Sequence, residues 1–458
     1  MLDTARPAPM TARPPAVRIA VVGAGFAGTV VTARLLAALT RPAALTLIDA
    51  NGRFGPGLAY STDHPRHLMN TRAGTVSAVP VEPAHFTQWL SRQGAAADED
   101  AFVPRGVYGR YLSELLDVAA SRSDIPLSRV TAEAIDLVAD SRGVTVRLAS
   151  GDAITADHLV LCVGYGPRLP RRAGSRIVDD PWSDWCDRVA PGDAVLFRGS
   201  GLTMVDQALR LVANGHRGRM LAVSRRGLLP TTQTAAIDTL AVAPPPRLRD
   251  AVRWLRDTAA AAGDRRGAWR SAVDALRPHA QKLWLGFTPA ERDRFARHVQ
   301  PYWSVHRHRM PPAAAEQIER LLGDAVLKVC AGRLGAPEES AAAVCVPFTS
   351  RRRRSSSVLR AHWLVDCSDP QRALAASPLS FALVARGLAS AGPAGIAFRV
   401  GSDGVFRSGA DAVPGLYGLG PPGRDALGEI TAIPEIREQA ARVAARIAEA
   451  VNNGSAVE

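Results

Sequence analysis

The stretch VRIAVVGAGFAGTVVTARLL, from Val17 to Leu36, decides the fold of this chain. It begins with a nearly all-apolar run that ends at Val22, as expected for a strand buried on both faces. Three glycines with the spacing G-x-G-x-x-G follow, and a helical run from Phe26 to Leu39 begins among them. This order of strand, glycine turn and helix predicts the first unit of a parallel α/β fold.

Each glycine of this turn has a physical role of its own. Gly23 permits the tight turn, Gly25 lets a pyrophosphate approach the backbone, and Gly28 lets the helix pack closely on the strand. The next strand, ALTLIDA, leads to Asp49, 21 positions after Gly28, where a carboxylate can accept hydrogen bonds from a ribose. An acid at this point suits a ribose without a 2′-phosphate, so this first cradle is expected to hold FAD or NAD.

A second cradle begins at Val195, in VLFRGSGLTMVDQALRL. Gly199 and Gly201 occupy the first two glycine positions, but Met204 replaces the third, so the helix is expected to stand slightly farther from its strand. Asp206 falls near the predicted helix start, where an acid interacts favourably with the helix dipole. Capping or first-turn electrostatics is therefore the role expected for Asp206.

The strand after this second helix, RMLAVSRRG, ends in Ser224, Arg225 and Arg226, where the first cradle carries Asp49. An arginine at this place can pair with a 2′-phosphate through charge-assisted hydrogen bonds. The second cradle is therefore expected to bind NADPH, which would reduce the FAD, and a surface arginine pair without a ligand is the alternative. The positions expected to contact NADPH are Gly199, Gly201, Leu202, Thr203, Ser224, Arg225 and Arg226.

The composition of the 458 residues, 47% hydrophobic and 22% charged, is that of a globular protein. The net charge of +13 suggests nucleic acid, but the cations are spread along the chain, and all are arginine except Lys282 and Lys328. We therefore expect no nucleic-acid partner. The one dense cluster, RRRRSSS from Arg351 to Ser357, is interpreted as a solvated loop, with attraction of an anionic substrate as the alternative.

The five cysteines are scattered, and none forms a C-x-x-C pair. This pattern argues against a disulfide scaffold, a zinc site and a thiol–disulfide redox enzyme, and it fits a reducing cytoplasm. Residues 1–16 are rich in Pro, Ala and Arg and are predicted to form a disordered tail. No apolar run reaches the roughly 18 residues that a membrane helix needs, so no membrane partner is expected.

Four longer stretches extend the pattern beyond the two glycine turns. They are GPGLAYSTDHPRHLMNTRAG (55–74), FVPRGVYGRYL (102–112), ALRPHAQKLWLGFTPAERDRFARHVQPYWSVHRHRMPP (275–312) and LYGLGPPGRDALGEITAIPEIREQA (416–440). With these stretches the chain resembles the bacterial FAD/NAD(P)-binding flavoproteins, which are related to flavin-dependent monooxygenases and N-hydroxylases. The resemblance implies an α/β fold with two Rossmann-like dinucleotide-binding domains, one for FAD and one for NADPH, the second inserted in the first.

By this resemblance, residues 17–190 and 365–458 form the FAD-binding domain. Residues 191–364 form the NADPH-binding domain, with a helical insert at about 247–322. The stretches LVLCVGYGP (159–167) and WLVDCSDP (363–370) are the expected crossings between the domains. Asp369 stands where the family usually has a glycine, which weighs against a close backbone contact at the second crossing.

The resemblance also implies which residues surround the flavin. The segment that ends in Asn70 would run under the isoalloxazine ring, where Asn70 is the candidate catalytic residue, bonding to flavin N5 or to a flavin-bound oxygen. A loop-stabilising amide is the alternative role, and Tyr60, Tyr108 and Arg110 are weaker candidates for the same pocket. The positions expected to contact FAD are Gly23, Gly25, Phe26, Ala27, Gly28, Asp49, Ala50, Gly57, Leu58, Ala59, Tyr60, His67, Leu68, Met69, Asn70, Gly164, Gly420, Pro421, Thr431, Ala432 and Ile433.

The C-terminal stretch 416–433 would close the FAD site. Its GLGPPG turn would meet the pyrophosphate or ribityl chain. A helix that starts near Thr431, with Pro434 in its first turn, would point its N-terminus at the flavin pyrimidine ring. That direction makes physical sense because reduced flavin carries negative charge there. A helix that only packs on the sheet is the alternative.

The insert contains PYWSVHRHRMPP, which combines aromatic and cationic groups. Tyr302, Trp303 and His306 are therefore candidates for lining a substrate or nicotinamide pocket, with an aromatic core as the alternative. His306 and His308 are two positions apart and do not share a helix face, so no metal site is expected.

The resemblance implies an oxidoreductase, and specifically a cytoplasmic flavin-dependent monooxygenase. It would use NADPH and O2 to oxidise a small molecule through a C4a-(hydro)peroxyflavin, and amine N-hydroxylation in a biosynthetic pathway is the leading version. The F-x-G-x-x-x-H-x-x-x-W signature of one monooxygenase class is absent. The alternatives are a reductase that passes electrons from NADPH through FAD to another acceptor, and a non-enzymatic flavoprotein. Substrate and oligomeric state stay open.

Overall fold

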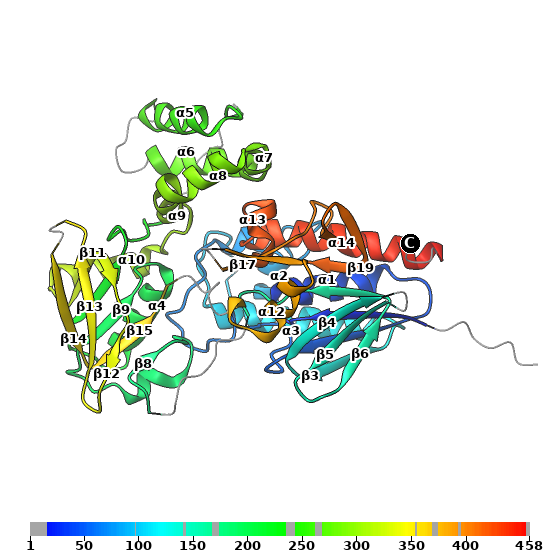
Figure 1. The fold of residues 1–458 in the computed structure, drawn as a ribbon, viewed down its shortest axis with the longest axis horizontal. Helices are drawn as coiled ribbons and strands as arrows, with labels where there is room; N and C mark the ends of the chain where they lie inside the picture. The colour runs from blue at the N-terminus through cyan, green and yellow to red at the C-terminus, as the bar shows by residue number, and fades with distance from the viewer. Residues whose placement is uncertain are drawn as a thin grey trace, which may run out of the picture.

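The computed structural model describes residues 16–96, 98–140, 143–166, 174–234, 243–261, 268–352, 355–368, 374–392 and 395–454. Two sheets lie at opposite ends of the molecule, and a group of helices rises beside the second of them (Figure 1). Both sheets have a parallel centre, which confirms the predicted pair of Rossmann-like units. The expected tail (1–16) and Asp369 fall on positions outside these ranges, apart from residue 16.

The first sheet has six strands in the order β18-β19-β7-β1-β2-β3. All neighbouring pairs are parallel except β18 with β19, as expected for strands connected by crossovers. The strands are β1 (Val17–Val22), β2 (Ala43–Asp49), β3 (Leu127–Thr131), β7 (His158–Leu161), β18 (Val405–Ser408) and β19 (Asp411–Gly418).

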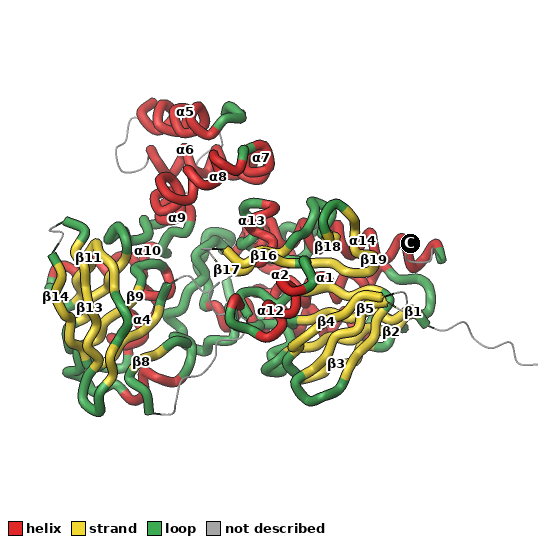
Figure 2. Tube along the Cα trace, viewed as in Figure 1, coloured by secondary structure: helices red, strands yellow, loops and turns green. Residues whose placement is uncertain are grey.

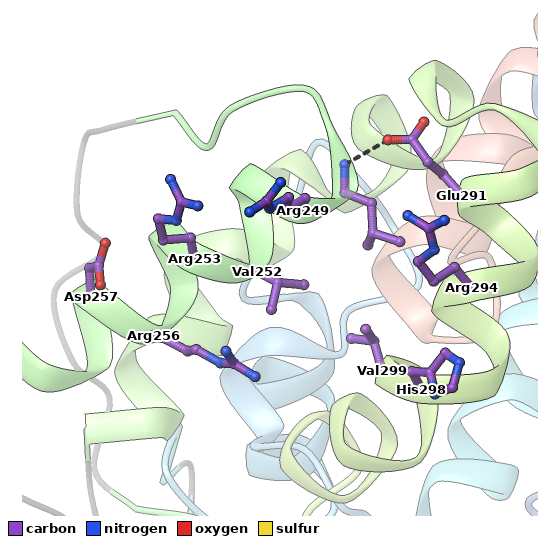
Figure 3. A pocket seen from close by; sticks show the side chains of 10 residues that line it. Arg249, Val252, Arg253, Arg256, Asp257, Glu291, Arg294, His298 and Val299 are labelled. Atoms are coloured by element: carbon purple, nitrogen blue, oxygen red, sulfur yellow. Dashed lines mark hydrogen bonds between the residues drawn. The ribbon is translucent and has the colours of Figure 1, made fainter.

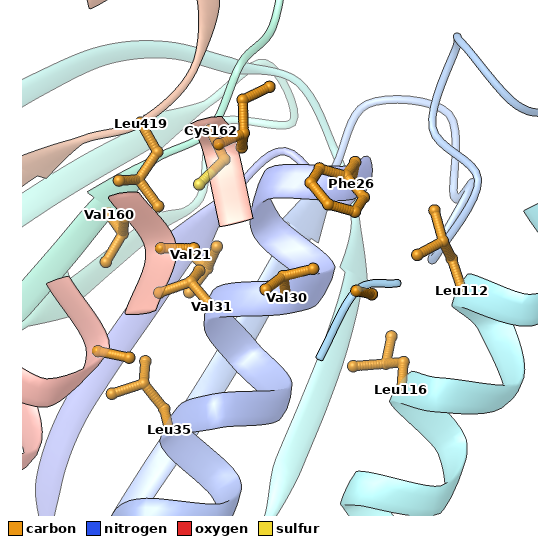
Figure 4. Packing of buried hydrophobic residues seen from close by; sticks show 14 of the residues in the cluster. Val21, Phe26, Val30, Val31, Leu35, Leu112, Leu116, Val160, Cys162 and Leu419 are labelled. Carbon is orange, nitrogen blue, oxygen red and sulfur yellow. The ribbon is translucent and has the colours of Figure 1, made fainter. Parts of the chain in front are cut away.

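The helix α1 (Phe26–Ala38) is apolar on nearly every side because it is packed on nearly every side. It lies between β1, α3 (Arg105–Ser121) and α14 (Ile433–Asn453). Figure 4 shows Val30 and Leu35 of α1 among Val21 of the sheet and Leu116 of α3, all of them buried. Truncating one such leucine typically costs about 2–5 kcal/mol, so this contact fixes the glycine turn that precedes α1.

Smaller elements complete the first unit. A three-stranded antiparallel sheet, β4-β5-β6, and a two-stranded one, β16-β17, lie against it. These elements are α2 (His85–Arg92), β4 (Ala134–Asp140), β5 (Gly143–Leu148), β6 (Ala153–Ala156), α12 (Pro378–Ala385), β16 (Ala389–Gly392), β17 (Gly395–Phe398) and α13 (Arg424–Leu427), with the short turns η1 (Ala73–Thr75) and η5 (Pro421–Gly423).

The second sheet has eight strands, with the order β12-β13-β11-β10-β9-β15-β8 and β14 paired to β13. The parallel part runs from β11 to β8, and β12, β13 and β14 extend it as antiparallel strands. The strands are β8 (Ile177–Val178), β9 (Val195–Arg198), β10 (Met220–Ser224), β11 (Leu327–Leu334), β12 (Glu338–Glu339), β13 (Val344–Ser350), β14 (Ser356–Ala361) and β15 (Trp363–Asp366). Thus β8 pairs in the second sheet, although the sequence analysis assigned residues up to 190 to the first domain.

Helices α4 (Leu202–Ala213) and α10 (Pro312–Gly323) pack on the second sheet. The other helices of the predicted insert form a separate layer with an apolar core of their own (Figure 2). They are α5 (Leu248–Ala261), α6 (Ala268–Leu276), α7 (Ala280–Gly286), α8 (Pro289–Arg294) and α9 (Gln300–Arg307), with the short turns η3 (Arg277–His279) and η4 (Phe295–Val299) between them. Another short turn, η2 (Asp184–Arg188), lies between β8 and β9 in the chain. The range predicted for the insert, 247–322, therefore includes most of α10, but α10 packs on the second sheet against β10 and β11 and is not part of the separate helical layer. Among the described helices, none is long and apolar enough to cross a membrane.

Candidate functional site

The first glycine turn is shaped by contacts that only glycine allows. Gly23 has a positive φ of 97°, and a Cβ there would lie 2.3 Å from the Cys162 carbonyl oxygen. A Cβ at Gly28 would lie 1.8 Å from the Gly23 carbonyl oxygen. Both positions are therefore closed to any side chain, which is the close helix–strand approach that the sequence predicted.

The space in front of α1 fits a pyrophosphate. Gly25 precedes the helix, which has no side-chain cap, so its first N–H groups keep their hydrogen-bonding capacity for a ligand. A Cβ at Gly25 would meet only the Gly57 Cα, at 3.6 Å, whereas a Cβ at Gly57 would lie 2.5 Å from the Gly25 Cα. The two glycines thus let two backbone segments approach each other beside the open helix end.

Asp49, the expected ribose ligand, also organises the loop after its own strand. Its Oδ1 accepts hydrogen bonds from the backbone N–H groups of Asn51 and Arg53, both at 3.0 Å, and its Oδ2 accepts from Ala24 at 3.2 Å. A carboxylate offers about four acceptor sites, so these bonds leave capacity for a ribose hydroxyl. Its contact with the cofactor stays a prediction.

The C-terminal stretch forms the turn and helix that the resemblance implied. Gly420 has a φ of 82°, and its N–H donates to the Gln439 side chain at 3.0 Å. The helix α14 begins at Ile433, two residues later than expected, with Pro434 inside its first turn. Ala432 precedes it without a side-chain cap, so this helix end too can stabilise negative charge.

Several expected flavin contacts have their side chains in the protein's own packing. Phe26 and Met69 are buried in the core of the first unit, and Tyr60 packs edge-on against the buried Tyr108 ring at 4.9 Å. Tyr108 donates its hydroxyl to the Val76 carbonyl, and Arg110 is exposed on α3. The role of these two weaker candidates in a flavin pocket stays a prediction. The remaining expected positions, including Ala27, Ala50, Leu58, Ala59, Leu68, Gly164, Pro421 and Thr431, stay predictions.

Asn70 lies where the two units of the protein meet. Its backbone carbonyl accepts a hydrogen bond from Gln233 Nε2 at 2.9 Å, and Gln233 Oε1 in turn accepts from Arg309 Nη1 at 3.5 Å. Arg309 is buried and held by both oxygens of Asp274 in α6, at 2.9 and 3.0 Å. The Asn70 side chain makes no hydrogen bond to any residue that the structure describes, so its amide is available to a ligand.

His67 bridges the units instead of standing free in a pocket. Its Nε2 lies 3.3 Å from the Asp206 carbonyl oxygen, which can only accept, so Nε2 carries the proton. Its Nδ1 then accepts from the Thr62 hydroxyl at 2.7 Å. Burial lowers the pKa of His67 to about 3, in keeping with this neutral form. Both ring nitrogens are thus engaged within the protein.

The role expected for Asp206, capping or first-turn electrostatics, is wrong. Asp206 lies beyond the first turn of α4, and its carboxylate forms a buried ion pair with Arg105 of the first unit at 2.9 Å. Arg105 also donates to the Leu68 carbonyl and lies over the Trp182 ring. Burial raises the pKa of Asp206 to about 6 despite the neighbouring guanidinium. The residue therefore joins two units rather than capping one helix, and only tertiary contact reveals this.

The second cradle repeats the open geometry of the first. Gly199 has a φ of 109°, and a Cβ there would lie 2.6 Å from the Cys367 carbonyl oxygen. A methyl group at Gly201 would meet no described atom within 4 Å, and α4 begins after it without a side-chain cap. Met204, in place of the third glycine, fills the core beneath the helix. The space before Gly201 therefore fits a phosphate-bearing ligand, which Leu202 and Thr203 would meet through their backbone N–H groups.

The residues after β10 lie beside this cradle. The Ser200 hydroxyl donates to the Leu228 carbonyl at 2.5 Å and lies 2.8 Å from Ser224 Oγ. Arg226 donates to the Arg297 carbonyl at 2.8 Å and lies over the Tyr302 ring at 5.2 Å. The Arg225 side chain is exposed and pairs with no residue that the structure describes. Of the two expected phosphate ligands, Arg225 is therefore the less engaged within the protein.

The aromatic candidates on α9 are placed on three different sides. Tyr302 lies against Arg226, His306 stacks on Trp269 at 5.9 Å, and Trp303 donates its indole N–H to Glu429 of the first unit. Burial lowers the pKa of His306. The structure therefore does not bring these three side chains together in one pocket, and their substrate role stays a prediction.

A second charged cluster joins α9 to the stretch that closes the predicted FAD site. Buried Arg307 contacts Glu429 Oε2 at 3.1 Å and Glu435 Oε1 at 3.3 Å, and Arg277 reaches the same Glu435 oxygen. Glu435 lies in the first turn of α14. No local pattern in the sequence indicates these contacts, although the acidic residues lie beside the expected flavin contacts Ala432 and Ile433.

A hollow of about 640 Å³ lies within the helical layer, away from both cradles (Figure 3). Its wall combines several exposed arginines with Glu291, whose carboxylate is already occupied by Leu248 and by the N-terminus of α8. The lining residues are Leu248, Arg249, Val252, Arg253, Arg256, Asp257, Glu291, Arg294, His298 and Val299. Within the described ranges, no group of three or more His, Cys, Asp or Glu side chains is arranged to hold a metal ion.

Residues 20–166 match a family model described as FAD-NAD(P)-binding. The match confirms the predicted resemblance and the dinucleotide-binding character of the first cradle. No curated protein sequence matches the chain.

Solved structures match over nearly the whole chain at low sequence identity. Reduced ornithine hydroxylase PvdA from Pseudomonas aeruginosa is 13% identical, with a TM-score of 0.64 and coverage of 95% of this chain and 99% of the other. Ornithine N-hydroxylase KtzI from Kutzneria sp. 744, with reduced FAD, NADP+ and L-ornithine, is 14% identical, with a TM-score of 0.62 and the same coverage. Bacillithiol disulfide reductase Bdr from Staphylococcus aureus is 10% identical, with a TM-score of 0.53 and coverage of 94% and 98%. These similarities confirm the predicted two-cradle fold.

Proposed function

We propose that this chain is an FAD-dependent, NADPH-using monooxygenase that hydroxylates the nitrogen of a small amine. The contact between Asn70 and Gln233 carries the proposal. It joins the segment expected under the flavin to the chain that leaves the second cradle, so a nicotinamide held by that cradle would be directed toward the flavin. The N-hydroxylases with the same overall fold support the choice of reaction.

Bound FAD would accept a hydride and activate O2, and the protein would supply binding, orientation and exclusion of water. The open end of α1 would hold the pyrophosphate, and the N-terminus of α14 would stabilise negative charge on the pyrimidine ring. The free amide of Asn70 would orient the flavin edge or the substrate. This division of labour explains why the described residues of the proposed site include no nucleophile paired with a base.

The test is a rapid-mixing experiment. The purified protein is reduced with NADPH without oxygen, then mixed with O2 in the presence of ornithine, lysine or a short diamine as probe. We expect a transient near-UV absorbance before the oxidised flavin spectrum returns, together with a hydroxylamine product. Immediate return of oxidised flavin with release of hydrogen peroxide, for every probe, would overturn the proposed monooxygenase.

A reductase is the second candidate, because the similarity to Bdr shows that reductases share this fold. The chain lacks the C-x-x-C pair that is typical of thiol–disulfide enzymes, so we expect an electron acceptor other than a disulfide. Steady reduction of a quinone or a metal complex by NADPH under anaerobic conditions, faster than peroxide formation in air, would favour this candidate.

A further inference from the structure

The hairpin at the outer edge of the second sheet places Arg351 beside the residues that follow β10 in the second cradle. Strands β13 and β14 pair antiparallel beyond β11 (Figure 1). After β13 ends, the Arg351 N–H donates to the Ala331 carbonyl at 3.0 Å, and Ala331 is in register with Ser224 of β10. The first residue of the arginine-rich stretch that the sequence analysis interpreted as a solvated loop is therefore anchored beside the end of β10.

The Arg351 side chain reaches past β11 to the expected phosphate ligands after β10. Its Nη1 donates to the Arg225 carbonyl at 3.4 Å. This is the one hydrogen bond of its guanidinium in the described ranges, and a guanidinium has five N–H groups. The remaining donors lie beside the residue whose own side chain has no described partner.

The local charge is strongly one-sided. Arg225, Arg226, Arg351 and Arg352 lie at this edge, and no carboxylate forms an ion pair with any of them in the described part of the chain. Like charges at close range repel one another, whereas an anion with several oxygens between them would receive charge-assisted hydrogen bonds. The end of the second strand of such a cradle is the place where a ribose 2′-phosphate binds.

We infer that Arg351 is a third ligand of the NADPH 2′-phosphate, reaching it from the β13–β14 hairpin beside Arg225. The inference rests on the proposed NADPH specificity of the second cradle. It adds a specificity-determining residue that lies 126 positions from Arg225 in the chain, outside the glycine motif and outside the strand that follows it.

Binding of two nucleotides that differ in the 2′-phosphate distinguishes a phosphate-binding role of Arg351 from a purely structural one. The flavoprotein is titrated calorimetrically with 2′,5′-ADP, which carries the 2′-phosphate, and with 5′-ADP, which lacks it. Arg351→Ala should weaken binding of 2′,5′-ADP about tenfold and leave 5′-ADP within about twofold, because one charged hydrogen-bonding partner is lost. Arg351→Lys keeps the charge but loses the planar fork, so it should restore only part of the affinity.

Arg360→Ala is the matched control, because Arg360 lies on the same hairpin, opposite Cys345 and away from the turn. It should leave the affinity for both nucleotides unchanged. Unchanged affinity for 2′,5′-ADP in Arg351→Ala, or an equal loss in both alanine variants, would overturn the inference while NADPH specificity stands. Equal affinity of the unmodified protein for the two nucleotides would overturn the NADPH assignment itself, and the inference with it.

Discussion

At the scale of single residues, the role of Asp206 depends on a tertiary contact that its position in the sequence does not indicate. Asp206 lies on a cradle helix but faces the other unit, where Arg105 is its counter-charge. Burial of both groups is unfavourable, and their pairing offsets this cost only while both are present. The raised pKa of Asp206, about 6, is the sign that the balance is incomplete.

Arg105→Ala should therefore destabilise the protein in a pH-dependent manner. Above the pKa of Asp206 the variant must bury an unpaired charge or protonate it, and the free energy of unfolding should fall by about 3 kcal/mol at pH 8. At pH 5 the carboxyl is already largely protonated, so the loss should be about 1 kcal/mol. Denaturant unfolding at the two pH values measures the difference.

The control for this prediction is Arg105→Ala combined with Asp206→Asn. A neutral amide does not titrate, so the loss caused by Arg105→Ala in that background should be the same at pH 5 and pH 8. A loss in Arg105→Ala alone that is equal at both pH values would show that Asp206 is not the titrating partner.

The two arginines after β10 should respond differently to replacement. Arg225 has no described side-chain partner, so Arg225→Ala should raise the KM for NADPH about tenfold and leave that for NADH within about twofold. Arg226 holds the Arg297 carbonyl and Tyr302, so Arg226→Ala should also lower stability. Steady-state kinetics with both nucleotides, with thermal unfolding of each variant, tests this, and an equal change for NADPH and NADH in Arg225→Ala contradicts it.

At the scale of elements, the open N-termini of α1 and α4 are the features that a ligand would use. Neither helix has a side-chain cap, and both follow a glycine with space in front of it. Their N–H groups and dipoles are therefore left for phosphates. The difference between the cradles lies in the next strand, which ends in Asp49 in one and in arginines in the other.

Replacing one glycine with alanine in either cradle should impair the ligand of that cradle and not the ligand of the other. Gly25→Ala meets only ordinary contact within the protein, so the chain should fold but purify without yellow flavin. Gly201→Ala should purify with flavin and bind NADPH about tenfold more weakly, because the methyl displaces the phosphate from the helix end. Flavin absorbance per chain and nucleotide titration are the measurements.

Gly286→Ala in α7 is the matched control, because a methyl group there also meets no described atom within 4 Å. It should leave flavin content and nucleotide affinity unchanged. Flavin retained at full occupancy in Gly25→Ala would show that the pyrophosphate is not bound at this turn.

At the scale of the whole molecule, α9 holds the units together. It contacts the second cradle through Tyr302 and the first unit through Trp303 and Arg307. The Arg105–Asp206 pair is a separate contact between the units. Since the proposed hydride transfer needs the nicotinamide against the flavin, we expect the rate to depend on both.

Glu429→Gln should slow flavin reduction by NADPH at saturation about tenfold, with the nucleotide affinity nearly unchanged. The amide can still accept from Trp303 but no longer balances the buried Arg307. Stopped-flow reduction under anaerobic conditions measures the rate. Glu438→Gln on α14 is the matched control, since its carboxylate is largely exposed and only 3.8 Å from Arg437. An equal rate in both variants would exclude a role of this contact.

The sequence by itself determined the two cradles, because glycine spacing, apolar strands and the residue after the second strand are local properties of the chain. It also placed Pro434 in the first turn of the last helix. Only the tertiary structure decided the partners of Asp206, His67 and Arg307, since each pairs with a residue more than a hundred positions away. The physical reason is that local spacing sets backbone shape, whereas burial and charge pairing depend on which distant surfaces pack together.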